Sequence, residues 1–231
     1  MTIKKVSFIF IPIIMTIFMV VIGMLTRNSY INDVDVNKYF NDKELNYTIS
    51  KYEEDITKVF TKFESLKNLD ELEKESPIIV KAKVDSKSPR IRYYLTTLTT
   101  VKVLNVYKGK ISNDFISVFE PIDIIDAVDS AGTVNSVDGY NWMDKEKEYI
   151  LFLRPLKDSH YSDDSVVYLP TTTVLSKYQI DESKVSLLDE DKMLNGSLKY
   201  ADIKNQEVVL YEDQYVDKFN NFKRDVLNKY N

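Results

Sequence analysis

The single histidine of the chain lies among acidic residues. His160 is close in sequence to Asp158, Asp163 and Asp164. Imidazole and carboxylate groups are common metal ligands, and a His–Asp pair can also activate a serine. The chain contains no G-x-S-x-G turn of the kind that holds a serine nucleophile in many hydrolases. The pattern therefore favours a solvated loop around His160, with a hydrolase site as the alternative.

A second group of carboxylates follows Pro121. Asp123, Asp126 and Asp129 are spaced by three and would share one face of a helix. Calcium loops place their ligands at alternate positions around a glycine, so this spacing does not predict a calcium site. Paired carboxylates also catalyse glycoside hydrolysis. We interpret the segment as an acidic loop of a barrel, and a hydrolase built on these Asp-rich loops remains the alternative.

Three aromatic residues are candidates for a binding surface, namely Tyr94, Tyr140 and Trp142. Trp142 comes shortly before a predicted strand, where an aromatic ring offers rigid contact area at low entropic cost. The same ring would also serve as a plug at the end of a barrel, and this second interpretation is favoured. The sequence predicts no catalytic residue, no cofactor site and no metal site.

The composition excludes several classes of function. The chain has 231 residues and no cysteine, which excludes disulfides, cysteine nucleophiles and thiolate zinc sites. The net charge is −5, and all 36 acidic residues lie after Arg27. A nucleic-acid partner would require a basic surface, and so would electrostatic attachment to anionic lipid. We expect neither for the part of the chain that follows Arg27.

An uncharged apolar run near the N-terminus predicts a membrane anchor. Residues 6–25 carry no charge, and a helix of this length spans about 30 Å, the thickness of a hydrocarbon core. Lys4 and Lys5 precede the run, so the positive-inside rule places the N-terminus in the cytoplasm and the rest outside. The run exceeds the apolar region of a cleaved signal peptide and lacks a small-x-small cleavage pattern. We therefore predict an uncleaved, single-pass anchor in the cell membrane.

The remaining sequence predicts helix, then strands, then helix. Residues 51–67 have helical apolar spacing, and Asn68 with Glu71 predicts the capped start of a short helix over 69–75. Runs of β-branched and aromatic residues predict strands at 78–84, 91–106, 115–119, 149–153, 166–169 and 171–180.

Residues 211–230 predict an amphipathic helix, because large apolar side chains recur every three or four positions. These side chains are Tyr211, Tyr215, Phe219, Phe222, Val226 and Tyr230. Sequential short strands without intervening helices favour an antiparallel sheet closed into a small barrel. The predicted fold class is α+β: an N-terminal transmembrane helix, then a small antiparallel OB-like β-barrel flanked by amphipathic helices.

The order of four strand and turn signatures resembles a group of exported Gram-positive bacterial proteins. The signatures begin with ESPIIVKAKV at 75–84 and TVKVLNVYKG at 100–109, and continue with FISV at 115–118 and EKEYILFL at 146–153. More distantly, they resemble the OB-like barrel of netrin and tissue-inhibitor-of-metalloprotease domains. The cysteine by which those inhibitors reach a zinc has no counterpart, so protease inhibition is not expected.

We thus predict four regions: an anchor at 1–27, a connector with a helix at 28–68, an OB-like domain at 69–182, and a connector with the packed C-terminal helix at 183–231. The predicted function is a non-catalytic, membrane-anchored extracellular domain that binds a protein or another cell-envelope component. A cell-envelope hydrolase using the Asp-rich loops or His160 is the alternative.

Overall fold

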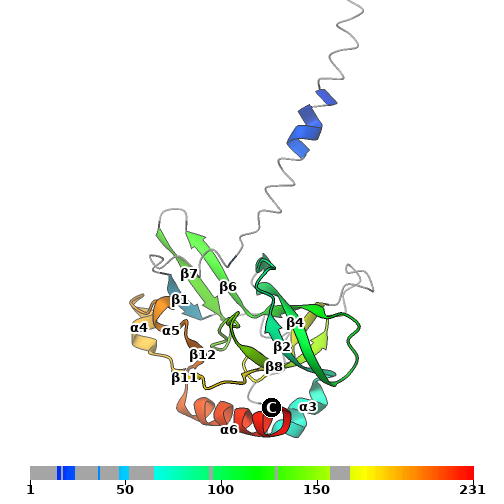
Figure 1. Cartoon of the computed structure of the whole chain (residues 1–231). Helices are drawn as coiled ribbons and strands as arrows, with labels where there is room; N and C mark the ends of the chain where they lie inside the picture. Colours follow the sequence, from blue (N-terminus) through cyan, green and yellow to red (C-terminus); the bar gives the residue numbers. More distant parts are fainter. Residues whose placement is uncertain are drawn as a thin grey trace, which may run out of the picture.

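The structure is a computed structural model that describes the following residues: 15–16, 18–23, 36, 47–51, 65–93, 96–127, 130–156 and 167–231. It shows a mixed α+β domain built around a β-barrel (Figure 1). Five strands form this barrel: β2 (Ile78–Val84), β4 (Thr96–Lys108), β5 (Phe115–Glu120), β8 (Glu148–Pro155) and β9 (Val167–Pro170).

The barrel is closed, which is consistent with the predicted OB-like architecture. Around the ring, β2 pairs with β4, β4 with β5, β5 with β9, β9 with β8, and β8 with β2. The prediction of a wholly antiparallel sheet is wrong at one pair, because β5 and β9 run parallel. A closed ring with an odd number of strands cannot alternate direction at every pair, so one parallel pair is unavoidable.

Two faces of the barrel wall are buried. Alternate side chains, among them Val80, Val101 and Ile116, fill the barrel interior. On β2 and β8 the outward side chains are also buried, since Ile79 and Phe152 belong to a second core outside the barrel. The continuous apolar run of β8 follows from this position between two cores.

The capped helix predicted over 69–75, just before the barrel, is confirmed. Helix α3 (Leu69–Glu75) begins after Asn68, whose side-chain oxygen accepts a 3.0 Å hydrogen bond from the backbone N–H of Glu71. The Glu71 carboxylate in turn accepts from the N–H of Lys67 at 2.8 Å. The first bond satisfies an amide group that the first turn of a helix leaves without a partner, and the second ties the residue before the N-cap to the same turn.

The long strand predicted over 91–106 is divided in two. Strand β3 (Ile91–Tyr93) pairs antiparallel with the start of β4, and Tyr93 faces Thr96. The hydroxyl of Thr96 donates to the carbonyl of Tyr93 at 2.8 Å. This reversal carries neither glycine nor proline, so the sequence lacked the usual turn signal.

The predicted acidic loop after Pro121 is wrong, because the segment forms a hairpin of β6 (Ile122–Ala127) and β7 (Ser130–Ser136). Strand β1 (Thr48–Lys51) adds to β7 in parallel. Ile122 and Ile124 are buried on one face, whereas Ile125 is exposed. The relevant spacing is therefore the period of two of a strand, and not the period of three of a helix.

The predicted connector after residue 183 contains regular structure. Its elements are β11 (Lys184–Leu187), α4 (Glu190–Leu194), α5 (Tyr200–Ile203) and β12 (Gln206–Leu210). Strands β11 and β12 pair in parallel, and β10 (Lys177–Gln179) extends the barrel sheet beside β8.

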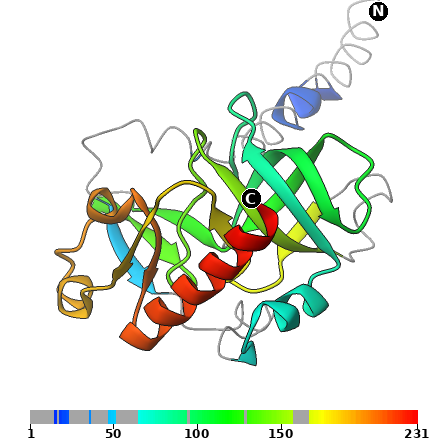
Figure 2. The ribbon, with the colours of Figure 1, turned by 60° about the horizontal axis from the view of Figure 1, so that its bottom comes forward.

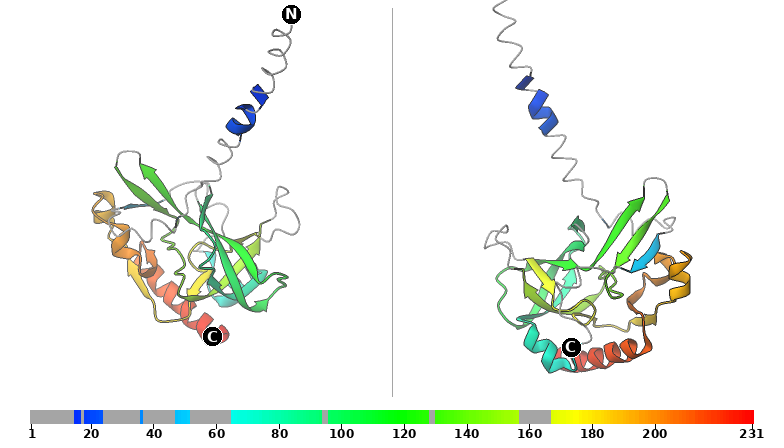
Figure 3. Two further views of the ribbon diagram at one scale, coloured as in Figure 1. Left: turned by 45° about the horizontal axis from the view of Figure 1, so that its top comes forward. Right: turned by 180° about the vertical axis from the view of Figure 1, so that it is seen from behind.

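The C-terminal helix α6 (Asp213–Tyr230) covers the outer core of the barrel wall (Figure 2). Phe219, Phe222 and Val226 are buried, and the ring of Phe219 stacks on Tyr178 with centroids 5.4 Å apart. The hairpin of β6 and β7 lies on the opposite side of the molecule from α6 (Figure 3). The predicted apolar stripe is confirmed at these three positions, while Tyr211 precedes the helix.

The fold predictions for the N-terminal third fall largely outside the described residues. This applies to the helix predicted at 51–67 and to most of the anchor predicted at 6–25. Residues 15–16 and 18–23 of the predicted anchor are helical. In the described part of the chain, no helix is both long enough and apolar enough to cross a membrane.

The packing of α6 generates a stability prediction. Phe219→Ala and Phe222→Ala should each lower the free energy of unfolding by about 3–5 kcal/mol, because truncating a buried phenylalanine loses its apolar contacts and leaves a cavity. Asn221→Ala, at an exposed position of the same helix, is the control and should change stability by less than about 0.5 kcal/mol. Denaturant titration measures both. Unchanged stability of the phenylalanine variants would show that α6 does not hold the domain together.

Candidate functional site

Of the three predicted aromatic residues, the two that the structure describes do not lie at a surface. Tyr140 is 2 % exposed and Trp142 is 6 % exposed, so both side chains lie inside the domain. Tyr94 lies outside the described residues, as do His160 and Asp129. Asp123 is fully buried, and its carboxylate forms an ion pair with Arg92 at 3.1 Å.

A tight turn before Tyr140 directs this segment inward. Asp138 and Gly139 both adopt positive φ angles, of 52° and 81°. A β-carbon on Gly139 would lie 1.8 Å from the carbonyl oxygen of Val209, so only glycine fits this position. Gly139 accepts a hydrogen bond from the N–H of Val209 at 2.9 Å. The turn is thereby fixed to β12, and the residues that follow it enter the core.

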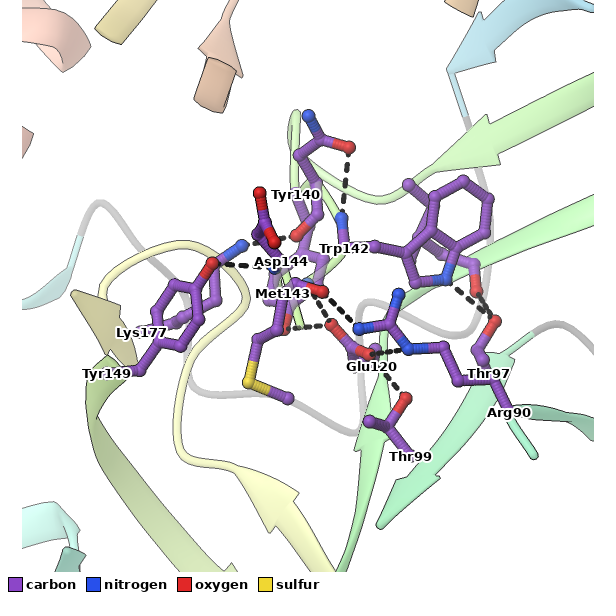
Figure 4. A network of polar contacts seen from close by, with 12 residues as sticks. Arg90, Thr97, Thr99, Glu120, Tyr140, Trp142, Met143, Asp144, Tyr149 and Lys177 are labelled. Atoms are coloured by element: carbon purple, nitrogen blue, oxygen red, sulfur yellow. Dashed lines mark hydrogen bonds and ion pairs between the residues drawn. The ribbon is translucent and has the colours of Figure 1, made fainter. Parts of the chain in front are cut away.

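At the centre of this region is the buried carboxylate of Glu120, at the end of β5 (Figure 4). One oxygen, Oε2, accepts from the hydroxyl of Tyr140 at 3.0 Å and from the N–H of Met143 at 2.7 Å. The other, Oε1, accepts from the hydroxyl of Thr99 and lies 3.9 Å from Nε of Arg90. Arg90 is itself buried and donates to the carbonyl of Met143. The carboxylate therefore has partners on both oxygens and is closed to solvent.

Trp142 closes the network on one side. Its indole N–H donates to the hydroxyl of Thr97 at 3.0 Å, and that hydroxyl donates to the carbonyl of Ile122 at 2.7 Å. The ring meets Tyr200 edge to face, with centroids 5.3 Å apart. The residue thus joins β4 to the segment that precedes β12, and its ring is buried in the core outside the barrel rather than exposed as a platform.

A second buried charge, Lys177, lies next to this network. Its ammonium group donates to the carbonyl of Asn141 and, at 3.2 Å, to the carbonyl of Glu207. It also lies 4.1 Å from the centre of the Tyr140 ring, within the range of a cation–π contact. Burial lowers the pKa of Lys177 to about 8, although the charges of Glu120 and Glu207 oppose this change.

The buried tyrosines of the network hold their protons. Burial, followed by the charge of Glu120, raises the pKa of Tyr140 well above its ordinary value. Burial likewise raises the pKa of Tyr149, whose hydroxyl accepts from the N–H of Asp144 at 2.7 Å. Neither phenol is available as a base near neutral pH, because each is neutral and already engaged.

The nearest approach to a catalytic arrangement consists of Ser183, Lys223 and Glu207. The Ser183 hydroxyl contacts both Lys223 and Glu207, and a serine beside a lysine is one known type of activated nucleophile. Lys223, however, forms a 2.6 Å ion pair with the Glu207 carboxylate. An ammonium group has no lone pair with which to accept a proton from the serine. The arrangement is a structural ion pair that links α6 to β12.

The described residues contain no group of three or more histidine, aspartate or glutamate side chains that could hold a metal ion. Sequence reasoning missed Arg90, Glu120, Lys177 and Glu207. One signal was present for Glu120, since alternation along β5 places it on the same inner face as Ile116 and Val118. Lys177 is the lone charge in an uncharged stretch from Pro170 to Ile180, but its partners are distant in the sequence.

Comparisons with protein families, with curated proteins and with solved structures give no match to this chain. The resemblance to exported Gram-positive proteins therefore stays an expectation, and the function has to be argued from the geometry of the domain.

Glu120→Gln should lower the free energy of unfolding by about 3–5 kcal/mol, because it removes one charge of a buried ion pair, whose two groups lie 3.9 Å apart. Glu146→Gln is the matched control, since its side chain is 83 % exposed and its 4.0 Å contact with Lys83 contributes at most about 1 kcal/mol. Fluorescence of Trp142, the only tryptophan, reports unfolding beside the altered carboxylate. Equal stability of the two variants would contradict the structural role of Glu120.

The lowered pKa of Lys177 predicts that the free energy of unfolding rises between pH 8 and 10. In this window the folded chain has released a proton that the unfolded chain, with an ordinary lysine pKa of 10.5, still binds. Above pH 10 the raised pKa values of the buried tyrosines reverse the trend, because only the unfolded chain then loses those protons.

The measurement is the free energy of unfolding across this range for the natural chain and for Lys177→Met, in which the rise should disappear. Lys184→Met, at an exposed position, should keep it. The same pH slope in both variants would show that Lys177 is not the titrating group.

Proposed function

We propose that this chain is a non-catalytic binding domain, held outside a bacterial cell membrane by an N-terminal signal anchor. The observation that carries the proposal is the state of the buried charged groups. Arg90, Glu120, Lys177 and Glu207 are each less than 5 % exposed. Arg90 faces Glu120, Lys177 donates to backbone carbonyls, and the Glu207 carboxylate accepts from the N–H of Gln179 and pairs with Lys223. Groups engaged in this way stabilise the fold and have no free position for a substrate.

The anchor rests on the 20 uncharged residues at 6–25 and on the lysines before them. Within the run, the helical residues Met15, Phe18 and Met19 are more than half exposed. Large apolar side chains exposed on a helix favour an apolar surrounding, which a bilayer supplies. An OB-like barrel resembling that of exported proteins would then face the outside, where such barrels commonly act as binding modules.

The absence of cysteine makes the orientation directly testable. A single cysteine introduced at Asn195, an exposed position after α4, should react with a membrane-impermeant maleimide in intact cells. A cysteine at Thr2, on the other side of the predicted span, should react only after lysis. The reverse pattern, or a mature chain that lacks the first 27 residues, would contradict an uncleaved outward-facing anchor.

The binding role is tested with full-length protein carrying photo-reactive side chains on exposed faces of the outer domain, irradiated in its own membrane. A binding domain should give defined crosslinks that survive Ser183→Ala and Lys223→Met, the substitutions that remove the nearest approach to a catalytic arrangement. Crosslinks from no face, or an envelope-hydrolysing activity that those substitutions abolish, would overturn the proposal.

A further inference from the structure

Strand β4 is longer than its neighbour on one side. It pairs with β2 over Val101–Lys108, but with β5 only over Thr97–Lys102. On this side, the last hydrogen bond of β4 runs from the N–H of Val103 to the carbonyl of Asp114, just before β5, at 2.8 Å. In the described part of the chain, no strand pairs with residues 104–108 on this side. This end of β4 is therefore an open sheet edge.

A groove lies where the missing strand would be. It lies between residues 103–106 of β4 and residues 111–114, the segment that leads into β5, and its volume is about 380 Å³. Ile111 packs against the barrel interior, and this contact holds residues 111–114 away from the end of β4. The side chains of Leu104 and Val106, which line the groove, are 41 % and 38 % exposed.

The charges around the groove are predominantly positive. Lys102, Lys108 and Lys110 are exposed in this stretch, whereas Asp114 is the only acidic residue between 102 and 115. This contrasts with the whole chain, whose net charge is −5. Lys108 reaches back to the carbonyl of Glu73 in α3, which leaves Lys102 and Lys110 to face solvent beside the groove.

We propose that the open edge of β4 binds an extended, acidic segment of a partner protein by strand addition, and this rests on the proposed binding function. Backbone groups along residues 104–108 supply the ladder, apart from the N–H of Val106, which donates to Oδ1 of Asn105 at 3.0 Å. Exposed apolar side chains supply contact area. Lys102 and Lys110 select for acidic residues that flank the added strand.

The lysines of this edge disfavour a second copy of this chain as the occupant. An antiparallel pairing of two β4 edges centred on Asn105 would place Lys102 of one copy opposite Lys108 of the other. Like charges directly opposite across a strand pair are destabilising. The charge pattern therefore acts against edge-to-edge self-association, a hazard that exposed strands carry, and in favour of an acidic partner.

The test uses the full-length protein in nanodiscs and three probes: a nine-residue peptide in which valine alternates with aspartate, its lysine counterpart of the same spacing, and a hexasaccharide of N-acetylglucosamine. Fluorescence anisotropy measures peptide affinity, and hydrogen–deuterium exchange locates the contact for each probe. The acidic peptide alone should bind and should protect residues 103–108.

Lys102→Glu with Lys110→Glu should weaken this binding at least about tenfold. The control pair Lys184→Glu with Lys204→Glu changes the net charge equally at exposed positions on β11 and after α5, and should leave affinity unchanged.

Several results would overturn the edge site: no binding of the acidic peptide, equal binding of the lysine peptide, protection outside this edge, saccharide binding in the groove, or dimers joined through β4. If the acidic peptide fails while another face still gives crosslinks in the native membrane, the edge site is wrong and the proposed binding function stands. If no face gives crosslinks, both are wrong.

Discussion

The buried carboxylate of Glu120 is the interaction on which the rest of the domain depends. Taking a carboxylate out of water costs several kcal/mol unless its oxygens are fully engaged. The partners that engage it come from separate places: Thr99 from β4, Tyr140 and Met143 from the segment before β8, and Arg90 from the residue before β3. Because these groups must converge on one point, the carboxylate fixes how the barrel, the hairpin of β6 and β7, and the turn at Gly139 fit together.

Tyr140 and Asn141 connect Glu120 to the opposite side of the molecule, because the carbonyl of Asn141 accepts a hydrogen bond from Lys177. The hydroxyl of Tyr140 donates to Glu120 while its ring contacts the ammonium group of Lys177. Lys177 also binds the carbonyl of Glu207, whose side chain pairs with Lys223 on α6. A continuous set of polar contacts thus extends from the barrel interior to the C-terminal helix. The buried charged residues, which are the usual candidates for catalysis, therefore hold parts of the fold together.

The sequence predicted the elements that depend on local signals. The capped start of α3 and the strand over Ile78–Val84 follow from residues within a few positions of one another. The hairpin after Pro121 was missed because its aspartates favoured an exposed acidic loop, whereas the burial of Asp123 depends on Arg92, about thirty residues earlier. The parallel pair of β11 and β12 brings together segments separated by two short helices, and no local pattern specifies it.

The burial of Trp142 was the favoured interpretation of its position, but the network around it was not predictable. Its hydrogen bond to Thr97 and the meeting of Glu120 with Arg90 join residues 30 to 45 positions apart. Such pairs are fixed by barrel closure and register, which a single sequence does not reveal. The open edge of β4 could not be predicted either, because it results from the unequal lengths over which β4 pairs with β2 and β5. Without that edge, the sequence gives no reason to assign a role to Lys102 and Lys110.

The central claim is that the network around Glu120 is permanent structure and not a site that opens to admit a substrate. Hydrogen exchange of the Met143 amide tests it most directly, because this N–H donates to Glu120 at 2.7 Å in the middle of the network. The account predicts that the Met143 amide exchanges only by global unfolding, with a rate that follows the free energy of unfolding as denaturant is added. Fast exchange that does not depend on denaturant would show that the network opens locally, and would contradict the account.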